Sequence, residues 1–168
     1  MNCSKSVFVT VGTTGFDELI RKVTTERVKA VLAERGYDRL TLQIGRGDFQ
    51  PETSSSLPKT EFYRFKDSIA EDIKSASLVI SHAGAGSVSE SLESGKSLLV
   101  VVNENLMGNH QVELAQKLKE LHYLFYCTCS TLEETLRHMD LNELHPYRSG
   151  DPKIFSEFLD SLMGYRES

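Results

Sequence analysis

The segment 81–87, with the sequence Ser-His-Ala-Gly-Ala-Gly-Ser, has the composition of an anion-binding loop. It follows a run suited to a buried strand (78–81) and opens directly into a helical pattern. Glycine and alanine let backbone N–H groups approach a ligand closely, and the N-terminus of the next helix favours negative charge. In α/β proteins that anion is very often a phosphate ester. The candidate phosphate-binding residues are therefore Gly84, Ala85, Gly86 and Ser87.

The spacing of this loop differs from two common nucleotide-binding motifs. The fingerprint G-x-G-x-x-G requires a third glycine where this chain has Ser89, and no Gly-Lys-Ser/Thr follows as in a P-loop. A nicotinamide-dependent dehydrogenase is disfavoured by the missing glycine and by the lack of a clear acidic residue at the end of the second predicted strand.

A second small-residue turn, Gly12-Thr13-Thr14, follows the first predicted strand at 7–11. Ligands of open α/β sheets bind along the edge formed by the carboxyl ends of the strands, where both turns belong. Two such turns could hold the two phosphates of one diphosphate. The alternative for Gly12 is an ordinary strand-to-helix turn.

Glu90 has two interpretations. Ser87 and Glu90 fit a capping box, with Ser87 as the N-cap and Glu90 folding back to its N–H. Alternatively, the carboxylate accepts hydrogen bonds from sugar hydroxyls, which would have to separate it from a diphosphate that repels it. One side chain cannot fully serve both roles.

The segment 103–111 follows the fifth predicted strand on the same edge and supplies amides and an imidazole suited to hydroxyl recognition. A helix N-cap explains Asn109 equally well. His110 and Gln111 have no obvious structural purpose and are candidate sugar-binding residues.

Metal and nucleophile chemistry find little support. The five histidines lack metal-ligand spacing and no Asp-x-Asp pair offers a magnesium site, so no metal cofactor is expected. No Ser/His/Asp or Cys/His arrangement can be built, which leaves His82 as the one local candidate for a general base. Cys127 and Cys129 are expected in the core, and the acidic pair Glu133-Glu134 on a solvated helix face.

Composition predicts one globular domain. The chain has 168 residues, of which 39% are hydrophobic and 26% charged, and its net charge of −5 argues against nucleic acid or an anionic membrane surface as a direct partner. The strand pattern begins almost at once, so no signal peptide is expected, and the longest aliphatic run (98–102) is far too short to span a bilayer. Three cysteines cannot all pair, so we expect reduced thiols and a cytoplasmic location.

Alternating hydrophobic runs and helical patterns predict an α/β, Rossmann-like domain: a mostly parallel sheet of about six strands with helices on both faces. The aliphatic run 98–102 predicts a central strand, Gly36 a helix stop, and 45–60 a loop. The expected strands are 7–11, 40–44, 61–65, 78–81, 98–102 and 123–127. The expected helices are 17–35, 68–75, 88–94, 107–121, 131–139 and 152–163.

These motifs together resemble a known family. The segment 81–90, the later Glu-Ser-Gly-Lys and the Asn-His-Gln helix start resemble the nucleotide-sugar-binding half of two-domain (GT-B) glycosyltransferases. With 9–14 and the Gln-Ile-Gly-Arg-Gly segment at 43–47, nearly the whole chain resembles the small cytosolic subunits of the UDP-N-acetylglucosamine (UDP-GlcNAc) transferase of dolichol-linked oligosaccharide synthesis.

The resemblance implies a function and roles for residues. Such a subunit binds UDP-GlcNAc, while a membrane-anchored subunit supplies the acceptor-binding half at the cytosolic face of the endoplasmic reticulum. Together they add the second GlcNAc to GlcNAc-diphosphodolichol in a β1,4 linkage with inversion. It further implies that 65–69, including Phe65, Lys66 and Ile69, lines the uracil and Glu90 holds the ribose. Gly12, Thr13, Thr14, His82 and 84–87 would surround the diphosphate, and His110 and Gln111 would meet the GlcNAc hydroxyls.

Two positions depart from the family pattern: Ser77 stands where Asp is expected, and Ser97 where Pro is expected. The alternative is therefore a diverged noncatalytic protein that binds nucleotide sugar or stabilises the partner. One domain leaves no room for an acceptor groove, so that groove and the general base are expected on the partner. The C-terminal segment 152–164 carries an apolar stripe that would dock onto the partner or onto this domain's own sheet.

Overall fold

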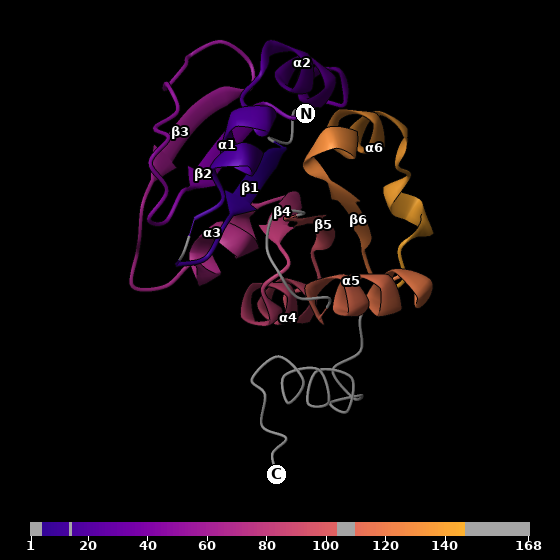
Figure 1. Cartoon of the computed structure of the whole chain (residues 1–168). Coiled ribbons are helices and arrows are strands. Elements are labelled where there is room, and N and C mark those ends of the chain that lie inside the picture. The colour runs from indigo at the N-terminus through magenta and orange to yellow at the C-terminus, as the bar shows by residue number, and fades with distance from the viewer. Residues whose placement is uncertain (1–4, 14, 104–109, 147–168) are drawn as a thin grey trace.

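The computed structural model describes residues 5–13, 15–103 and 110–146 (Figure 1). The expected helix at 152–163, the partner-docking segment 152–164, Thr14 and Asn109 lie outside these residues.

Six parallel strands form one sheet in the order β3-β2-β1-β4-β5-β6, which confirms the Rossmann-like α/β prediction. The aliphatic run at 98–102 was expected in the centre, but it belongs to β5, which lies next to the edge strand β6. β1 and β4 occupy the middle instead. The strands are β1 Ser6–Thr10, β2 Arg39–Gln43, β3 Lys59–Tyr63, β4 Leu78–His82, β5 Ser97–Val102 and β6 Phe125–Thr128.

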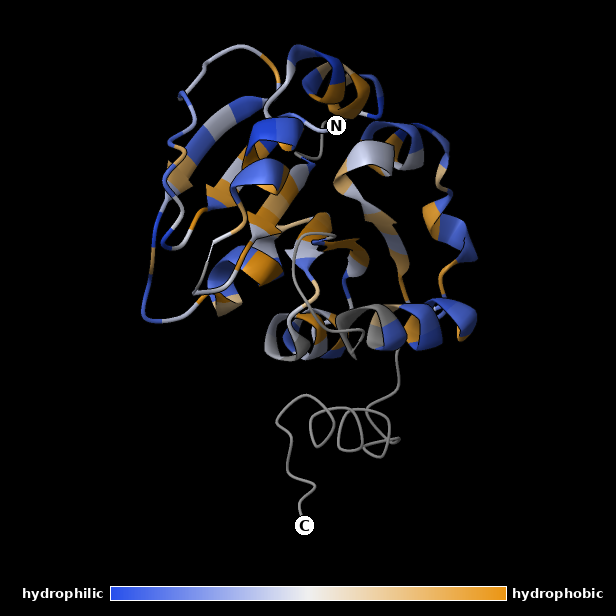
Figure 2. Cartoon of the chain, in the orientation of Figure 1, coloured by the Kyte–Doolittle hydropathy of each residue, from blue (hydrophilic) through white to orange (hydrophobic). Residues whose placement is uncertain are grey.

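Helices cover both faces of the sheet (Figure 1). Hydrophobic residues recur along the strands of the sheet (Figure 2). Successive strand residues point to opposite faces, so Val7 and Val9 pack into one apolar cluster while Phe8 packs into the other. The first face carries α1 Asp17–Val23, α2 Glu26–Glu34 and α6 Leu132–His138. The second carries α3 Ala70–Ser75, α4 Ala85–Glu93 and α5 His110–Glu120. Two 3₁₀ turns, η1 Cys129–Thr131 and η2 Leu141–Glu143, flank α6.

The single helix predicted at 17–35 is wrong, because two threonines divide it into α1 and α2. The Thr24 hydroxyl donates to the Ile20 carbonyl at 2.8 Å, and Thr24 caps the end of α1. The Thr25 hydroxyl accepts from the Val28 N–H at 3.3 Å and begins α2. Gly36, with φ of +92°, stands at the end of α2 as predicted.

Three smaller expectations had mixed outcomes. β3 begins at Lys59, two residues before the predicted start, and most of the 45–60 segment is a loop as expected. Cys127 and Cys129 are buried as predicted, and burial raises the pKa of the Cys127 thiol to about 12. The acidic pair lies at the surface as expected: Glu134 is exposed, and the partly exposed Glu133 carboxylate pairs with Arg27 and Arg137, each at 3.1 Å, which ties α6 to α2.

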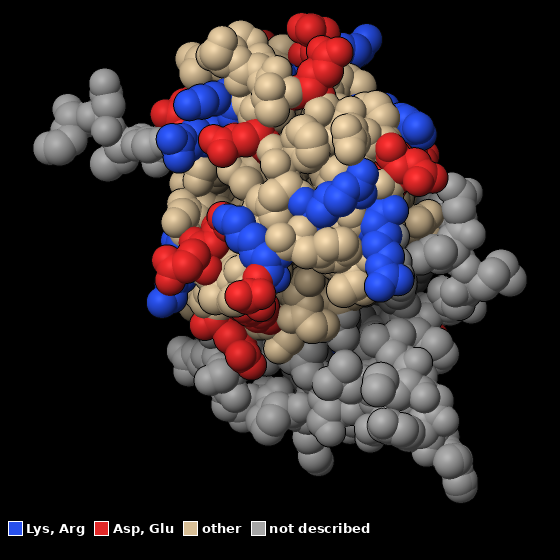
Figure 3. Space-filling model, turned by 90° about the vertical axis from the view of Figure 1, so that its left-hand side faces the viewer, with Lys and Arg blue, Asp and Glu red and all other residues tan. Residues whose placement is uncertain are grey.

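The surface has two plain features. On the face nearest β3, basic and acidic side chains are interspersed rather than gathered by sign (Figure 3). In the part of the chain that the structure describes, no helix is both long and apolar enough to cross a membrane.

Candidate functional site

The order in which the chain adds strands to the sheet reverses between β1 and β4. Moving outward from this pair, the chain continues to β2 and β3 on one side and to β5 and β6 on the other. The loops that leave the carboxyl ends of β1 and β4 therefore separate and leave a crevice, which is where open α/β sheets bind ligands. Register pairs Thr10 with Ser81, so the Gly12 turn and the 83–87 loop begin side by side.

The Gly12 turn is built against a second glycine-rich loop. Gly12 has φ of +74° and Gly45 has φ of +62°, a conformation that glycine adopts at little cost. A Cβ at Gly45 would lie 2.7 Å from the Gly12 carbonyl oxygen, and a Cβ at Gly15 would lie 2.6 Å from the Gly47 N. The loops after β1 and β2 thus pack backbone against backbone, which explains the glycines of the 43–47 motif.

His82 occupies the space between the two predicted phosphate turns. A Cβ at Gly12 would lie 2.7 Å from the His82 Nε2, and a Cβ at Gly84 would collide with the same ring. Burial lowers the pKa of His82 to about 4, so the imidazole is neutral at physiological pH. The ring therefore acts as a neutral spacer that requires glycine on both sides.

The N-terminus of α4 is open to an anion. Gly84 is the N-cap, no side chain caps the helix, and its first turn carries no acidic residue. A Cβ at Gly86 would meet nothing within 4 Å. The first N–H groups and the positive dipole end of this nine-residue helix are therefore left without a side-chain cap.

The capping box predicted for Ser87 and Glu90 is wrong. α4 begins at Ala85, so Ser87 lies inside the first turn and its carbonyl accepts a hydrogen bond from the Ser91 hydroxyl at 2.8 Å. The helix can start earlier because Gly84 has no side chain, whereas a Cβ at this position would collide with the His82 ring. Among the described residues, the Glu90 carboxylate has no hydrogen-bond or ion-pair partner, which leaves it available to a ligand.

A cavity of about 310 Å³ brings seven of the predicted site residues together at this crevice. Gly12 and Thr13 form one wall, the 65–69 segment forms another, and Ser87 and Glu90 of α4 close it, whereas the other predicted residues of the 82–87 segment do not line it. The cavity thus combines one small-residue turn, a carboxylate and an aromatic ring. Its lining residues are Thr10, Gly12, Thr13, Gln43, Phe65, Lys66, Asp67, Ser68, Ile69, Ser87 and Glu90.

Phe65 and Lys66 differ in how firmly they are held. Phe65 is 50% exposed, which is unusual for a large apolar side chain and leaves its ring accessible beside the cavity. The Lys66 ammonium pairs with Asp72 at 3.1 Å and lies 4.3 Å from the centroid of the Tyr63 ring. The Tyr63 hydroxyl also donates to Asp72 at 2.5 Å, so Lys66 belongs to a local network on α3.

Sequence reasoning gave no site role to Thr10 and Gln43, both of which line the cavity. Both are buried polar residues in otherwise apolar strands. A glutamine inside the strand pattern Leu-Thr-Leu-Gln-Ile was the available signal, because buried amides need hydrogen-bond partners.

The sugar-side prediction is placed only in part. His110 and Gln111 begin α5, the helix that follows β5, so their backbone stands at the predicted edge. Within the described residues, no group of three or more His, Cys, Asp or Glu side chains could hold a metal ion.

An all-parallel sheet with a cavity at its switch point, beside a glycine turn and the start of a helix, is the arrangement of nucleotide-binding α/β domains. A sequence model of the glycosyltransferase family 28 C-terminal domain matches residues 6–162. The UDP-N-acetylglucosamine transferase subunit ALG13 of Saccharomyces cerevisiae is 32% identical, over 92% of this chain and 94% of that protein. The chain therefore belongs to the glycosyltransferase family 28 C-terminal domains, in the family of ALG13 subunits.

Other relatives differ in length. Human ALG13 is 57% identical over 129 residues, which are 76% of this chain and 11% of the human protein. The chain thus matches only about a tenth of the length of its human and mouse relatives.

Solved structures agree on the fold. An NMR structure of ALG13 superposes with a TM-score of 0.73 at 27% identity, over 95% of this chain and 98% of that one. Acinetobacter baumannii MurG superposes with a TM-score of 0.67 over 95% of this chain and 51% of its own, at 18% identity, and therefore supports the fold alone.

Proposed function

We propose that this chain is the UDP-GlcNAc-binding subunit of a two-subunit N-acetylglucosaminyltransferase. The reaction adds the second GlcNAc, by β1,4 linkage with inversion, to GlcNAc-diphosphodolichol in N-glycan precursor synthesis. One observation carries the proposal: in a chain of the ALG13 family, a single cavity at the switch point contains residues suited to uracil, ribose and diphosphate.

We propose a role toward one part of the donor for each group of predicted site residues. The exposed ring of Phe65 offers a surface for the uracil. The Glu90 carboxylate accepts hydrogen bonds from the ribose hydroxyls, which keep it apart from the phosphates. The Gly12 turn and the N-terminus of α4 hold the diphosphate, and His110 and Gln111 meet the GlcNAc hydroxyls.

Departure of UDP requires that negative charge be stabilised as the glycosidic bond breaks. α4 reaches the cavity through Ser87 and Glu90, and in this scheme the positive end of the helix stabilises the charge, because fixed dipoles aimed at developing charge are an effective means of catalysis. No metal cofactor is needed in this scheme, because the helix end takes the part that a divalent ion plays elsewhere.

The general base is proposed to lie on the partner. His82 is the local candidate, but burial lowers its pKa to about 4, so it is a poor acceptor for the proton of a sugar hydroxyl. The word "subunit" in the names of the relatives supports a partner protein. We propose that this partner is membrane-anchored, binds the lipid-linked acceptor, and recruits the chain to the cytosolic face of the endoplasmic reticulum.

The C-terminal segment 152–164 is proposed to dock onto that partner. Its apolar residues recur at helical spacing and require a surface to cover them. A chain ending before 152 should remain folded but fail to co-purify with the partner; unfolding of the truncated chain would show that the segment packs on its own domain.

The proposal is tested in two steps with the full chain. Calorimetric titration should detect UDP-GlcNAc and UDP but not NADH, and binding of NADH would instead favour a dehydrogenase. Transfer to GlcNAc-diphosphodolichol should then require both the chain and membranes that carry the partner. Robust turnover by the chain alone would refute the two-subunit scheme, and binding without turnover in any combination would identify a noncatalytic binding protein.

A further inference from the structure

Gln43 is a buried amide at the carboxyl end of β2 whose hydrogen bonds join three separate segments. Only 3% of the residue is exposed, and it pairs in register with Thr10 of β1. Its Oε1 accepts from the Thr10 hydroxyl at 2.6 Å and from the N–H groups of Val11 and Gly12, both at 3.1 Å. Its Nε2 donates to the Gly12 carbonyl at 2.9 Å and to the Arg64 carbonyl at 2.8 Å.

In these five hydrogen bonds the amide uses both of its N–H donors, and its oxygen accepts three hydrogen bonds. Four of the five partner groups belong to the backbone, and the fifth is the Thr10 hydroxyl. The amide therefore has a single orientation that satisfies all five. A buried group so fully satisfied is rigid, because any rotation would leave several polar groups unpaired.

Of the two carbonyls that Nε2 joins, one belongs to a wall of the cavity and the other directly precedes a second wall. Gly12 lies in the turn proposed for the diphosphate, and Arg64 immediately precedes the 65–69 wall proposed for the uracil. Arg64 is itself fixed, since its Nη1 donates to the carbonyls of Gly45 at 2.9 Å and Gly47 at 2.7 Å. The planar amide of Gln43 therefore sets how far apart the two walls stand.

We propose that Gln43 is a positioning residue that fixes the distance between the diphosphate-binding and base-binding walls. This inference rests on the proposed function. It carries a specific consequence: a ligand that touches both walls depends on their separation, whereas a ligand that touches one wall does not. UDP touches both, uridine touches the base wall, and pyrophosphate touches the diphosphate wall.

The test compares affinities of the full chain for these three ligands by NMR titration. Gln43→Leu removes every side-chain hydrogen bond, and Gln43→Glu retains an acceptor for Val11 and Gly12 while losing both donors to the walls. Thr60→Val is the matched control, because the Thr60 hydroxyl is buried and donates to the Pro58 carbonyl at 2.9 Å away from the cavity. Thermal unfolding of each variant records how much stability it loses.

We expect both Gln43 variants to bind UDP about tenfold more weakly or worse, with uridine and pyrophosphate changed less than about threefold. The control should leave all three affinities unchanged at a comparable loss of stability. Equal weakening of the three ligands, unchanged UDP binding, or failure of both variants to fold would overturn the positioning role. A wild-type chain that does not bind UDP would refute the proposed function itself. That outcome is distinct from a failure of the Gln43 inference, which is seen only in the variants.

Discussion

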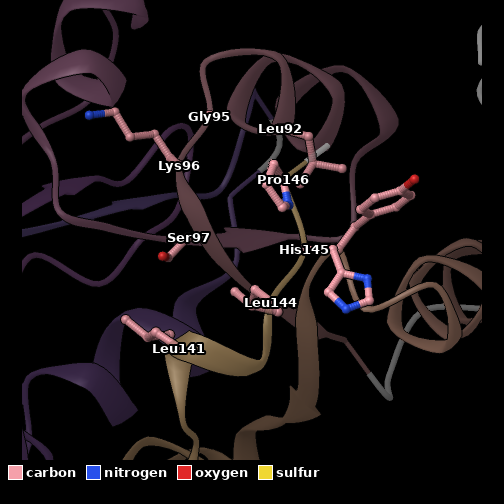
Figure 4. A pocket seen from close by; sticks show the side chains of 9 residues that line it. Leu92, Gly95, Lys96, Ser97, Leu141, Leu144, His145 and Pro146 are labelled. Atoms are coloured by element: carbon pink, nitrogen blue, oxygen red, sulfur yellow. The ribbon is translucent and has the colours of Figure 1, made fainter. Parts of the chain in front are cut away.

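Two hollows of similar size lie at opposite ends of α4, and they differ in chemistry. The first, about 310 Å³, lies at the N-terminus of the helix and is lined by the Gly12 turn, a carboxylate and polar strand ends. The second, about 240 Å³, lies at its C-terminus, before β5 begins, and is lined by Leu92, Gly95, Lys96, Ser97, Tyr123, Leu141, Leu144, His145 and Pro146 (Figure 4).

Helix polarity separates these two hollows more clearly than volume does. A helix presents unpaired N–H groups and positive partial charge at its start, and carbonyl groups with negative partial charge at its end. At the second hollow Lys96 points away from His145 and Pro146, and its ammonium donates to the Lys74 carbonyl at 2.7 Å (Figure 4). The electrostatics of α4 therefore favour binding of an anionic ligand, such as a nucleotide sugar, at the first hollow and not at the second.

Two glycines with the same backbone angle give the largest contrast, because Gly12 and Gly95 both have φ of +74°. Gly12→Ala adds a Cβ only 2.7 Å from the His82 ring, whereas Gly95→Ala places it in open space. The left-handed backbone costs each variant about 1–2 kcal/mol, and crowding adds about 1–3 kcal/mol at Gly12 alone.

We therefore expect Gly12→Ala to weaken UDP-GlcNAc binding about 100-fold or more, while Gly95→Ala loses stability only. Calorimetry and thermal unfolding on both variants measure the two effects. Equal donor affinity in the two variants would break the contrast between the hollows.

His82 should make stability depend on pH at the first hollow. Its folded-state pKa of about 4 lies below the ordinary 6.5, so the unfolded chain binds more protons between these values. The stabilising contribution is complete above pH 6.5 and is lost as pH falls toward 4, by up to about 3 kcal/mol.

The neutral variant His82→Gln removes this titration. Urea unfolding at intervals from pH 7 to pH 4 should show wild type losing stability more steeply than the variant. Parallel curves would mean that the imidazole already ionises freely in the folded protein.

Glu90 tests the ribose assignment. Glu90→Gln should weaken UDP-GlcNAc binding by about 1.5–3 kcal/mol, the usual scale for a hydrogen bond to a charged group. Stability should not change, because the side chain does not cap α4. Glu93→Gln makes the same charge change on an exposed position of the same helix and should leave affinity unchanged. Matching affinities for the two variants would show that Glu90 does not touch the donor.

Removal of divalent ions should have the smallest effect. With the partner present, transfer in EDTA should stay within about twofold of the untreated rate, since in the proposed scheme the end of α4 stabilises the leaving UDP. A complete loss that magnesium restores would reveal a metal site and shift the catalytic role away from the helix.

Features that follow a regular hydrophobic pattern could be predicted from the sequence. Helix ends could not, where they depend on whether a side chain or the next helical turn bonds to a backbone group. Alternating aliphatic runs predicted six strands, and the small-residue segments around the glycines at 12, 84 and 86 follow the carboxyl ends of strands as predicted. The break at Thr24 and Thr25 was missed because their neighbours keep a continuous helical period. Only the hydroxyl-to-carbonyl hydrogen bonds decide that α1 ends there.

The same reasoning explains the errors at the site. Ser87 and Glu90 have the spacing of a capping box, but the helix starts at Ala85 because Gly84 can lie against His82 where any side chain would collide. The role of Gln43 could not be predicted from sequence spacing, because its hydrogen-bond partners lie at the end of β1 and just after β3, far from it along the chain. Contacts between distant segments are set by the order of strands in the sheet, which the strand pattern alone does not give.

The most direct test of the account is an amide NMR titration of the full chain with UDP-GlcNAc. Shifts are expected at the first hollow, in Gly12, Thr13, the 65–69 segment, Ser87 and Glu90, with the second hollow around Lys96, Ser97 and Leu144 unmoved. Shifts confined to the second hollow, or no shifts at donor concentrations that sustain transfer with the partner, would contradict it.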